Sequence, residues 1–151
     1  MRKSKKQTTQ AEALSILENG EYGIMSVVDP AENEPYGVPL NFCFVNDAIY
    51  FHCAAEGRKI DLMKANPKVS FCVVGKTEIE PEEFTTKFES SIVNGRASEA
   101  FEDEKQIALE SLIKKYSSEF VSEGIDYIKR VGPQTTVYKI TIESITGKAS
   151  R

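Results

Sequence analysis

The chain has 151 residues, of which 40% are hydrophobic, and a net charge of −4. This length and composition suit one compact domain, and the mild acidity gives no general attraction to nucleic acid or to an anionic membrane. No apolar run approaches the ~20 residues of a membrane span, and the N-terminus lacks the apolar stretch of a signal peptide. Three cysteines without Cys-x-x-Cys spacing suit reduced thiols. We therefore expect a cytoplasmic protein that binds neither nucleic acid nor membranes.

The chain opens with a basic segment, Arg2-Lys3-Ser4-Lys5-Lys6. Such a segment is either an arm that contacts nucleic acid or a solvated tail, and we predict a disordered tail over residues 1–8 without a function. Residues Thr9-Gln10-Ala11-Glu12 have the spacing of a capping box, which predicts a helix over 9–19. A single domain should therefore occupy residues 9–151.

Six β-rich runs separated by turn residues predict a mostly β protein with helices in the gaps. The runs cover residues 23–28, 36–45, 48–53, 68–75, 88–98 and 135–142. Helices are expected between Gly57 and Pro67 and over 102–116. Residues 120–131 form either a helix or a loop, because Gly124 and Gly132-Pro133 make the pattern ambiguous. Because neighbouring strands adjoin through short connections, we expect a mostly antiparallel, closed or half-closed β-barrel rather than a doubly wound parallel sheet.

The dipeptide Asn46-Asp47 predicts a two-residue hairpin turn, because both residues tolerate the positive φ of a type I′ turn. This turn sets the register from Val45 opposite Ala48 to Asn41 opposite His52. The pairs between these two are Phe44–Ile49, Cys43–Tyr50 and Phe42–Phe51. Alternation gives an apolar core face and a second face that a ligand or partner could occupy. The core face holds Leu40, Phe42, Phe44, Ile49, Phe51 and Cys53, and the second face holds Asn41, Cys43, Val45, Ala48, Tyr50 and His52.

The tripeptide Gly57-Arg58-Lys59 follows the hairpin and opens a helix. Two cations beside the free N–H groups and the positive dipole end of a helix outline a phosphate site, although a solvated basic turn explains the same residues. Asn41 and His52 lie a few residues from this turn in the predicted register. An anionic ligand held there could extend along the second face of the hairpin.

His52 is the only histidine of the chain, which leaves no recognisable Cys/His spacing for a metal site. It is either a structural histidine or a functional one. No serine has a Gly-x-Ser-x-Gly context, and three scattered cysteines identify no nucleophile. A small barrel without an acid/base set of its own is suited to a cofactor that supplies the chemistry.

Three linked motifs carry a family resemblance. They are Tyr36-Gly37-Val38-Pro39-Leu40-Asn41-Phe42, then Ile49-Tyr50-Phe51-His52-Cys53-Ala54 with Gly57-Arg58-Lys59-Ile60, then Asn66-Pro67-Lys68-Val69-Ser70-Phe71. In this order they resemble the FMN-binding split-barrel superfamily related to pyridoxamine 5′-phosphate oxidase, and most of all its nitroimidazole-resistance (Nim-type) branch. The similarity extends from the helix before Gly23 to the closing Thr146-Gly147-Lys148.

The resemblance implies a six-stranded antiparallel split β-barrel that forms a homodimer with FMN at the subunit interface. It further implies that His52 is the candidate catalytic residue and that ten residues contact the cofactor. These are Val38, Pro39, Leu40, Asn41, His52, Arg58, Lys59, Ser91, Val93 and Lys148.

Two functions follow as hypotheses from this resemblance. The first is an FMN-dependent oxidoreductase that takes electrons from NADH or NADPH and reduces a small-molecule acceptor such as a nitroimidazole. The second is a non-catalytic dimeric module that binds flavin or haem. Reduction of bound flavin by a nicotinamide separates the two.

Overall fold

A computed structural model describes residues 4–151 of the chain, and its centre is one antiparallel sheet of seven strands. The spatial order of the strands is β2-β1-β5-β6-β7-β4-β3. In chain order they are β1 (Gly23–Asp29), β2 (Glu34–Leu40), β3 (Cys43–Val45), β4 (Ala48–Cys53), β5 (Lys68–Glu80), β6 (Thr85–Ala100) and β7 (Thr136–Ser150). The helices are α1 (Gln10–Asn19), α2 (Arg58–Ala65), α3 (Glu102–Tyr116) and α4 (Val121–Val131).

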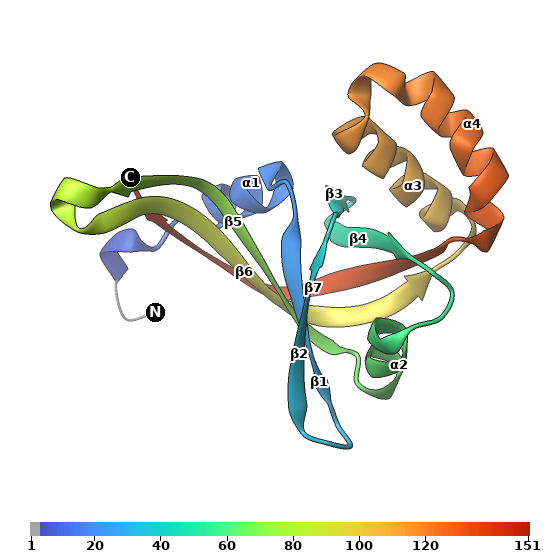
Figure 1. Cartoon of the computed structure of the whole chain (residues 1–151), viewed down its shortest axis with the longest axis horizontal. Coiled ribbons are helices and arrows are strands. Elements are labelled where there is room, and N and C mark those ends of the chain that lie inside the picture. Colours follow the sequence, from blue (N-terminus) through green and yellow to red (C-terminus); the bar gives the residue numbers. More distant parts are fainter. Residues whose placement is uncertain (1–3) are drawn as a thin grey trace.

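The long strands β5, β6 and β7 run together through the whole molecule (Figure 1). At one end they extend as an arm past α1, and at the other they curve toward β4, where α3 and α4 form a separate helical layer. The β1–β2 hairpin projects to one side, with α2 close to it (Figure 1). Within residues 4–151, no helix combines the length and apolarity that crossing a bilayer demands.

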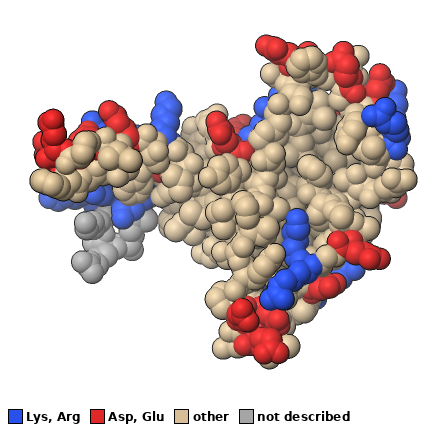
Figure 2. Space-filling model, in the orientation of Figure 1, with Lys and Arg blue, Asp and Glu red and all other residues tan. Residues whose placement is uncertain are grey.

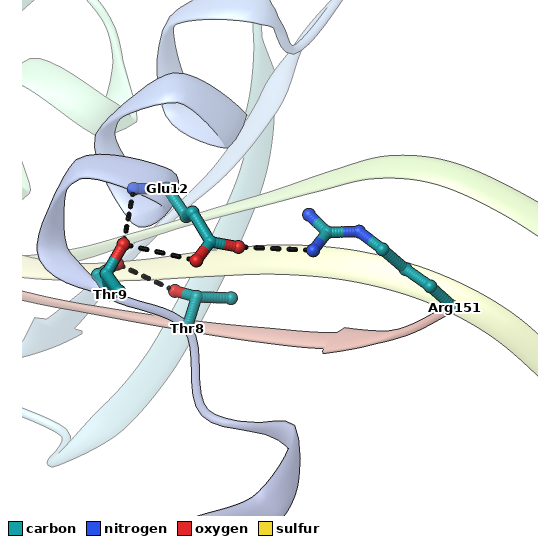
Figure 3. Close-up of polar contacts among 4 residues, drawn as sticks. All are labelled: Thr8, Thr9, Glu12 and Arg151. Atoms are coloured by element: carbon teal, nitrogen blue, oxygen red, sulfur yellow. Dashed lines mark hydrogen bonds and ion pairs between the residues drawn. The ribbon is translucent and has the colours of Figure 1, made fainter.

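The capping box at the start of α1 is confirmed. The Thr9 hydroxyl accepts a hydrogen bond from the backbone N–H of Glu12 at 3.1 Å, and the Glu12 carboxylate in turn pairs with Arg151 at 3.1 Å (Figure 3). Gln7 and Thr8, which the sequence places in a disordered tail, are bound to β7. Gln7 bridges to Lys148, and the Thr8 N–H donates to the Gly147 carbonyl at 3.0 Å. The first three residues of the predicted tail lie outside the described residues.

The sheet has seven strands instead of the predicted six, because the run over residues 36–45 is divided between two neighbours. Its first part, β2, pairs with β1, and its last part, β3, pairs with β4. The division falls at Asn41 and Phe42, where Tyr116 of α3 replaces a neighbouring strand. The Tyr116 hydroxyl accepts a hydrogen bond from the Phe42 N–H at 3.0 Å and lies 3.1 Å from the Phe42 carbonyl and 2.5 Å from the Glu21 carbonyl.

The predicted hairpin turn is confirmed, since Asn46 and Asp47 have φ values of 52° and 61°. The three pairs next to the turn, from Val45–Ala48 to Cys43–Tyr50, also have the predicted register. The two outer pairs, Phe42–Phe51 and Asn41–His52, are wrong, because β3 begins only at Cys43. On the other side of β4, His52 pairs with Val137 of β7.

The predicted core face of the hairpin is confirmed, with Phe42, Ile49 and Phe51 fully buried in the main core. The second face is largely not available to a ligand or partner. Its residues Cys43, Ala48 and Tyr50 are buried in a second core beneath α3 and α4, together with Ala100, Ala108, Leu109, Leu112, Ile128 and Val137. The apolar stripe of α3 is buried by packing against this face of the hairpin.

Residues 121–131, left open between helix and loop, form α4. Gly124 does not end this helix but allows it to approach α3, because a Cβ at this position would lie 2.4 Å from the Cγ2 atom of Ile113. The segment between the predicted runs 68–75 and 88–98 mostly continues these two strands as a β5–β6 hairpin, and Phe84 at its tip adopts a left-handed conformation and is 95% exposed.

Candidate flavin site at the β4–α2 junction

The N-terminus of α2 has the features of an anion site. Its N-cap residue, Gly57, has a φ of 150° and provides no side chain to cap the helix. The first helical bond runs from the Asp61 N–H to the Gly57 carbonyl at 3.1 Å, so the N–H groups of the three residues before Asp61 have no partner within the helix. Arg58 is exposed and Lys59 half-buried in this first turn. Free N–H groups, the helix dipole and two cations together favour a phosphate.

His52 lies at the end of β4, just before this turn, and its side chain is exposed at the rim of an apolar pocket. Desolvation by the surrounding side chains and, second, the positive charge of Lys59 lower the pKa of His52 below its ordinary value. The imidazole is therefore neutral at pH 7, with one nitrogen that donates and one that accepts a hydrogen bond.

Arg58 connects this turn to β2, because its guanidinium carbon lies 5.0 Å from the centre of the Tyr36 ring. Tyr36 and Val38 are two residues apart on one strand and so share a face of β2. Both are half-buried against the main core. The structure thus brings together Arg58, Tyr36 and Val38, and the predicted set includes all of them except Tyr36. Strict alternation with Val38 was the signal in the sequence that could have identified Tyr36.

Asn41 does not belong to this group. It lies beside α3, in a cavity that it shares with Lys115 and Tyr116, whereas His52 lines a different pocket. Pro39 is exposed and pairs with Ile24 on β1, so its side chain points to the opposite side of β2 from Val38.

Three further predicted contacts, Leu40, Ser91 and Val93, have side chains inside the protomer. Leu40 is 8% exposed, and Ser91 and Val93 are fully buried. The Ser91 hydroxyl donates to the Ala13 carbonyl at 2.6 Å and so fastens β6 to α1. Their side chains do not face a ligand within one protomer, and their contact with a cofactor remains a prediction from the resemblance.

Lys148 is remote from His52 within one protomer. It pairs with Ser90 in the arm, where its ammonium lies 5.6 Å from the centre of the Phe88 ring, while His52 pairs with Val137 at the start of β7. The strand from Val137 to Lys148 spans roughly 35 Å at about 3.3 Å per residue. One ligand cannot contact both side chains in a single protomer.

Figure 2 shows charge of both signs near the candidate site. Basic side chains gather on this face where Figure 1 places α2 and β2, and acidic side chains lie directly beside them. Side chains of both signs also lie on the β5–β6 arm and at the α3–α4 end of the molecule. The preference for an anion therefore rests on the first turn of α2 and not on the charge of the whole face.

A seven-stranded antiparallel sheet that coils into a split barrel, with a phosphate-type helix terminus beside it, defines the class of flavin-binding split-barrel proteins. The family model for pyridoxamine 5′-phosphate oxidase matches residues 9–149, and the chain belongs to this family. No protein with a curated description gives a significant match to the chain.

Solved structures share the fold at low sequence identity. A candidate 5-nitroimidazole antibiotic resistance protein from Bacteroides thetaiotaomicron is 23% identical, with a TM-score of 0.73 over 93% of this chain and 84% of that one. A FAD-binding protein from Mesorhizobium loti is 22% identical, with a TM-score of 0.67 over 97% and 98% of the two chains. A FAD- and haem-binding protein from Mycobacterium smegmatis is 17% identical, with a TM-score of 0.83 over 97% and 74%.

Proposed function

We propose that the protein is an FMN-dependent oxidoreductase that works as a homodimer. It takes electrons from NADH or NADPH and reduces a small acceptor, with a nitroimidazole-like compound as the leading candidate. The observation that carries this proposal is the uncapped N-terminus of α2, with Arg58 and Lys59 in its first turn and the neutral His52 beside it.

The residues present fit the phosphate of FMN. Gly57 has no Cβ, and nothing lies within 4 Å of the position that a Cβ would take, so an oxygen atom has room to approach the backbone. The free N–H groups and the Arg58 guanidinium can each donate to a phosphate oxygen. Lys59 adds a second positive charge close by.

Bound FMN would supply the redox chemistry, since flavins accept hydride from a nicotinamide and pass electrons on. The chain's own groups would hold the cofactor and move a proton. His52 is suited to the second role because its neutral imidazole could take up a proton from water on its free nitrogen and, as the imidazolium, give a proton to a reduced acceptor. Tyr36, held by Arg58, and Val38 provide an aromatic and an aliphatic surface next to the phosphate site.

Two observations support a homodimer. First, two predicted cofactor contacts, His52 and Lys148, lie about 35 Å apart along β7, and a second copy is the simplest way to bring both to one ligand. Second, the outer face of the sheet carries a row of paired residues, Ile24, Cys72 and Ile92, of which the two isoleucines are 38% and 46% exposed. An apolar row across three strands is typical of a surface that a partner covers.

The first test is the absorption spectrum of the purified protein, where flavin bands are expected. The sharper test is FMN affinity in Arg58→Ala and Lys59→Ala. Each charge-assisted bond to phosphate is worth about 1.5–3 kcal/mol, so Kd should rise on the order of 10- to 100-fold per substitution. Lys64→Ala is the matched control, because it removes one exposed charge from the other end of α2. A protein that is colourless and takes up no added FMN would overturn the proposal.

The second candidate is a non-catalytic module that binds flavin or haem. It is favoured by the solved relative that binds both FAD and haem and by the position of His52, an exposed imidazole that could ligate iron. Bound flavin that neither NADH nor NADPH reduces would support this second function. A haem absorption band that disappears in His52→Ala would do the same.

A further inference from the structure

A small apolar cavity of about 180 Å³ lies between α3, α4 and the end of β4. His52 forms one wall, and Leu109, Leu112 and Ile113 of α3 form another. The opposite side is made by α4 and the turn that follows it, with Tyr127, Ile128, Val131, Gly132 and Thr135. Figure 1 shows the two helices side by side above β4.

The lining excludes charged ligands. None of its residues is Asp, Glu, Lys or Arg, whereas each of the three larger cavities has at least one acidic and one basic residue. Its polar groups are the His52 imidazole, the Thr135 hydroxyl and the phenol of the exposed Tyr127. The Thr135 hydroxyl donates to the Val131 carbonyl at 2.9 Å, so its proton is already used. His52 is the group best placed to bond a ligand, and the lowered pKa of its imidazole keeps it uncharged.

The volume limits the size of the ligand. A dry apolar cavity of about 150 Å³ is large enough to bind benzene. The cavity beside His52 is slightly larger and therefore accommodates one substituted ring. The three fused rings of a flavin exceed this volume, so a flavin could not lie wholly inside the cavity.

We propose that this cavity binds a small, uncharged, monocyclic aromatic molecule with one hydrogen-bonding group, which bonds His52 while the ring lies among the side chains of α3 and α4. This goes beyond the function proposed above and does not depend on it, because the cavity and its apolar lining exist without FMN. His52 is the one lining residue that also belongs to the proposed flavin site.

Phenol and toluene are suitable probes, because they have nearly the same shape and differ in one hydroxyl. Titration of methyl-labelled protein should shift the NMR signals of Ile113 and Ile128 by the ring current of the bound probe. Intermolecular NOEs should connect the ring protons of the probe to the same methyl groups. Both effects should occur with and without added FMN. Absence of NOEs to Ile113 and Ile128 at saturating phenol and toluene would overturn the proposal without the use of any variant.

Val131→Phe should fill the cavity and raise the Kd of both probes by more than tenfold. Val121→Phe is the matched control, since it makes the same change in the same helix at a residue that does not line the cavity. Equal affinities in these two variants would contradict the assignment of the site.

His52→Phe should act on phenol alone. Loss of a net hydrogen bond of about 1 kcal/mol lowers affinity roughly fivefold, so the ratio of phenol to toluene affinity should fall by this factor. An unchanged ratio would show that His52 does not bond the ligand and would overturn that part of the proposal.

Discussion

The ammonium of Lys115 lies 3.7 Å from the centre of the Phe42 ring, over its face. Phe42 is fully buried and packs edge-to-face against Phe71 in the main core. Within residues 4–151, the Lys115 nitrogen is a buried side-chain nitrogen without a hydrogen-bond partner. The ring face is thus the main group that compensates for the loss of water around this cation.

This arrangement predicts that Lys115→Met stabilises the protein. A cation–π contact is worth about 0.5–2 kcal/mol, whereas a buried charge without hydrogen bonds costs several, so we expect a net gain of about 1 kcal/mol in the free energy of unfolding at pH 7. Chemical denaturation measures this, with the exposed neighbour Lys114→Met as the control. A loss of stability in Lys115→Met would show that the contact with Phe42 is the larger effect.

The same lysine should produce a pH effect. Desolvation lowers the pKa of Lys115 below its ordinary value of 10.5. Between the lowered pKa and 10.5, the unfolded chain binds a proton that the folded protein does not, so stability rises with pH across this interval. The difference in stability between wild type and Lys115→Met should therefore shrink as pH approaches 10.5. A difference that stays constant would contradict the lowered pKa.

Tyr116→Phe should destabilise the protein by about 2 kcal/mol. The substitution leaves the N–H of the buried Phe42 without its partner, and an unsatisfied buried backbone group costs about 1–3 kcal/mol. Tyr22→Phe, at a tyrosine that is 56% exposed, is the control and should have little effect. Equal stabilities of the two variants would mean that water replaces the hydroxyl at Phe42.

Ser91→Ala separates a structural role from contact with a cofactor. Removal of the hydroxyl takes away the bond that joins β6 to α1, while the Ala13 carbonyl keeps its backbone bond within α1, so the loss should be about 0.5–1.5 kcal/mol of stability. FMN affinity should not change, because the side chain is enclosed between β6 and α1. A rise in the Kd for FMN in a folded Ser91→Ala protein would instead support the direct contact that the family resemblance implies.

Glu104 should contribute to acid sensitivity. Its carboxylate accepts hydrogen bonds from Lys139 at 2.8 Å and from Tyr50 at 2.7 Å, and these bonds lower the pKa of Glu104 below its ordinary value of 4.5. Because the pKa of Glu104 is lower in the folded protein than in the unfolded chain, its carboxylate stabilises the folded protein above pH 4.5. This stabilisation is lost as the pH falls through the lowered pKa. Glu104→Gln should therefore lose less stability than wild type below pH 4.5. Asp103→Asn, in the same helical turn, should behave as wild type.

Local signals predicted the parts of the fold that depend on local chemistry. Asn46-Asp47 specified its turn, and Thr9 with Glu12 specified the start of α1, because the deciding contacts are within four residues. The end of β2 depends on Tyr116, which lies 74 positions along the chain from Phe42. No alternation within residues 36–45 could reveal this contact.

The site shows the same limit. The turn Gly57-Arg58-Lys59 was predictable because its chemistry lies in consecutive residues, but Asn41 was assigned to His52 only through a register that ends at Cys43. The cavity beside His52 had no signal of its own. Its walls are side chains of α3 and α4, whose sequences show only the apolar stripes of ordinary helices. The space arises from the way these two helices pack on β4.

The two ends of the described chain meet beside α1. Gln7 bridges to Lys148, and Arg151 pairs with Glu12, so the first and last segments run antiparallel next to each other (Figure 3). A short linker could join them, and new ends could be opened at the exposed turn Pro81–Glu83. Such a circular permutant would keep every pair of neighbouring strands. It would lose only the connection between β5 and β6 at the tip of the arm. The order of the elements along the chain is therefore separable from the arrangement that forms the site.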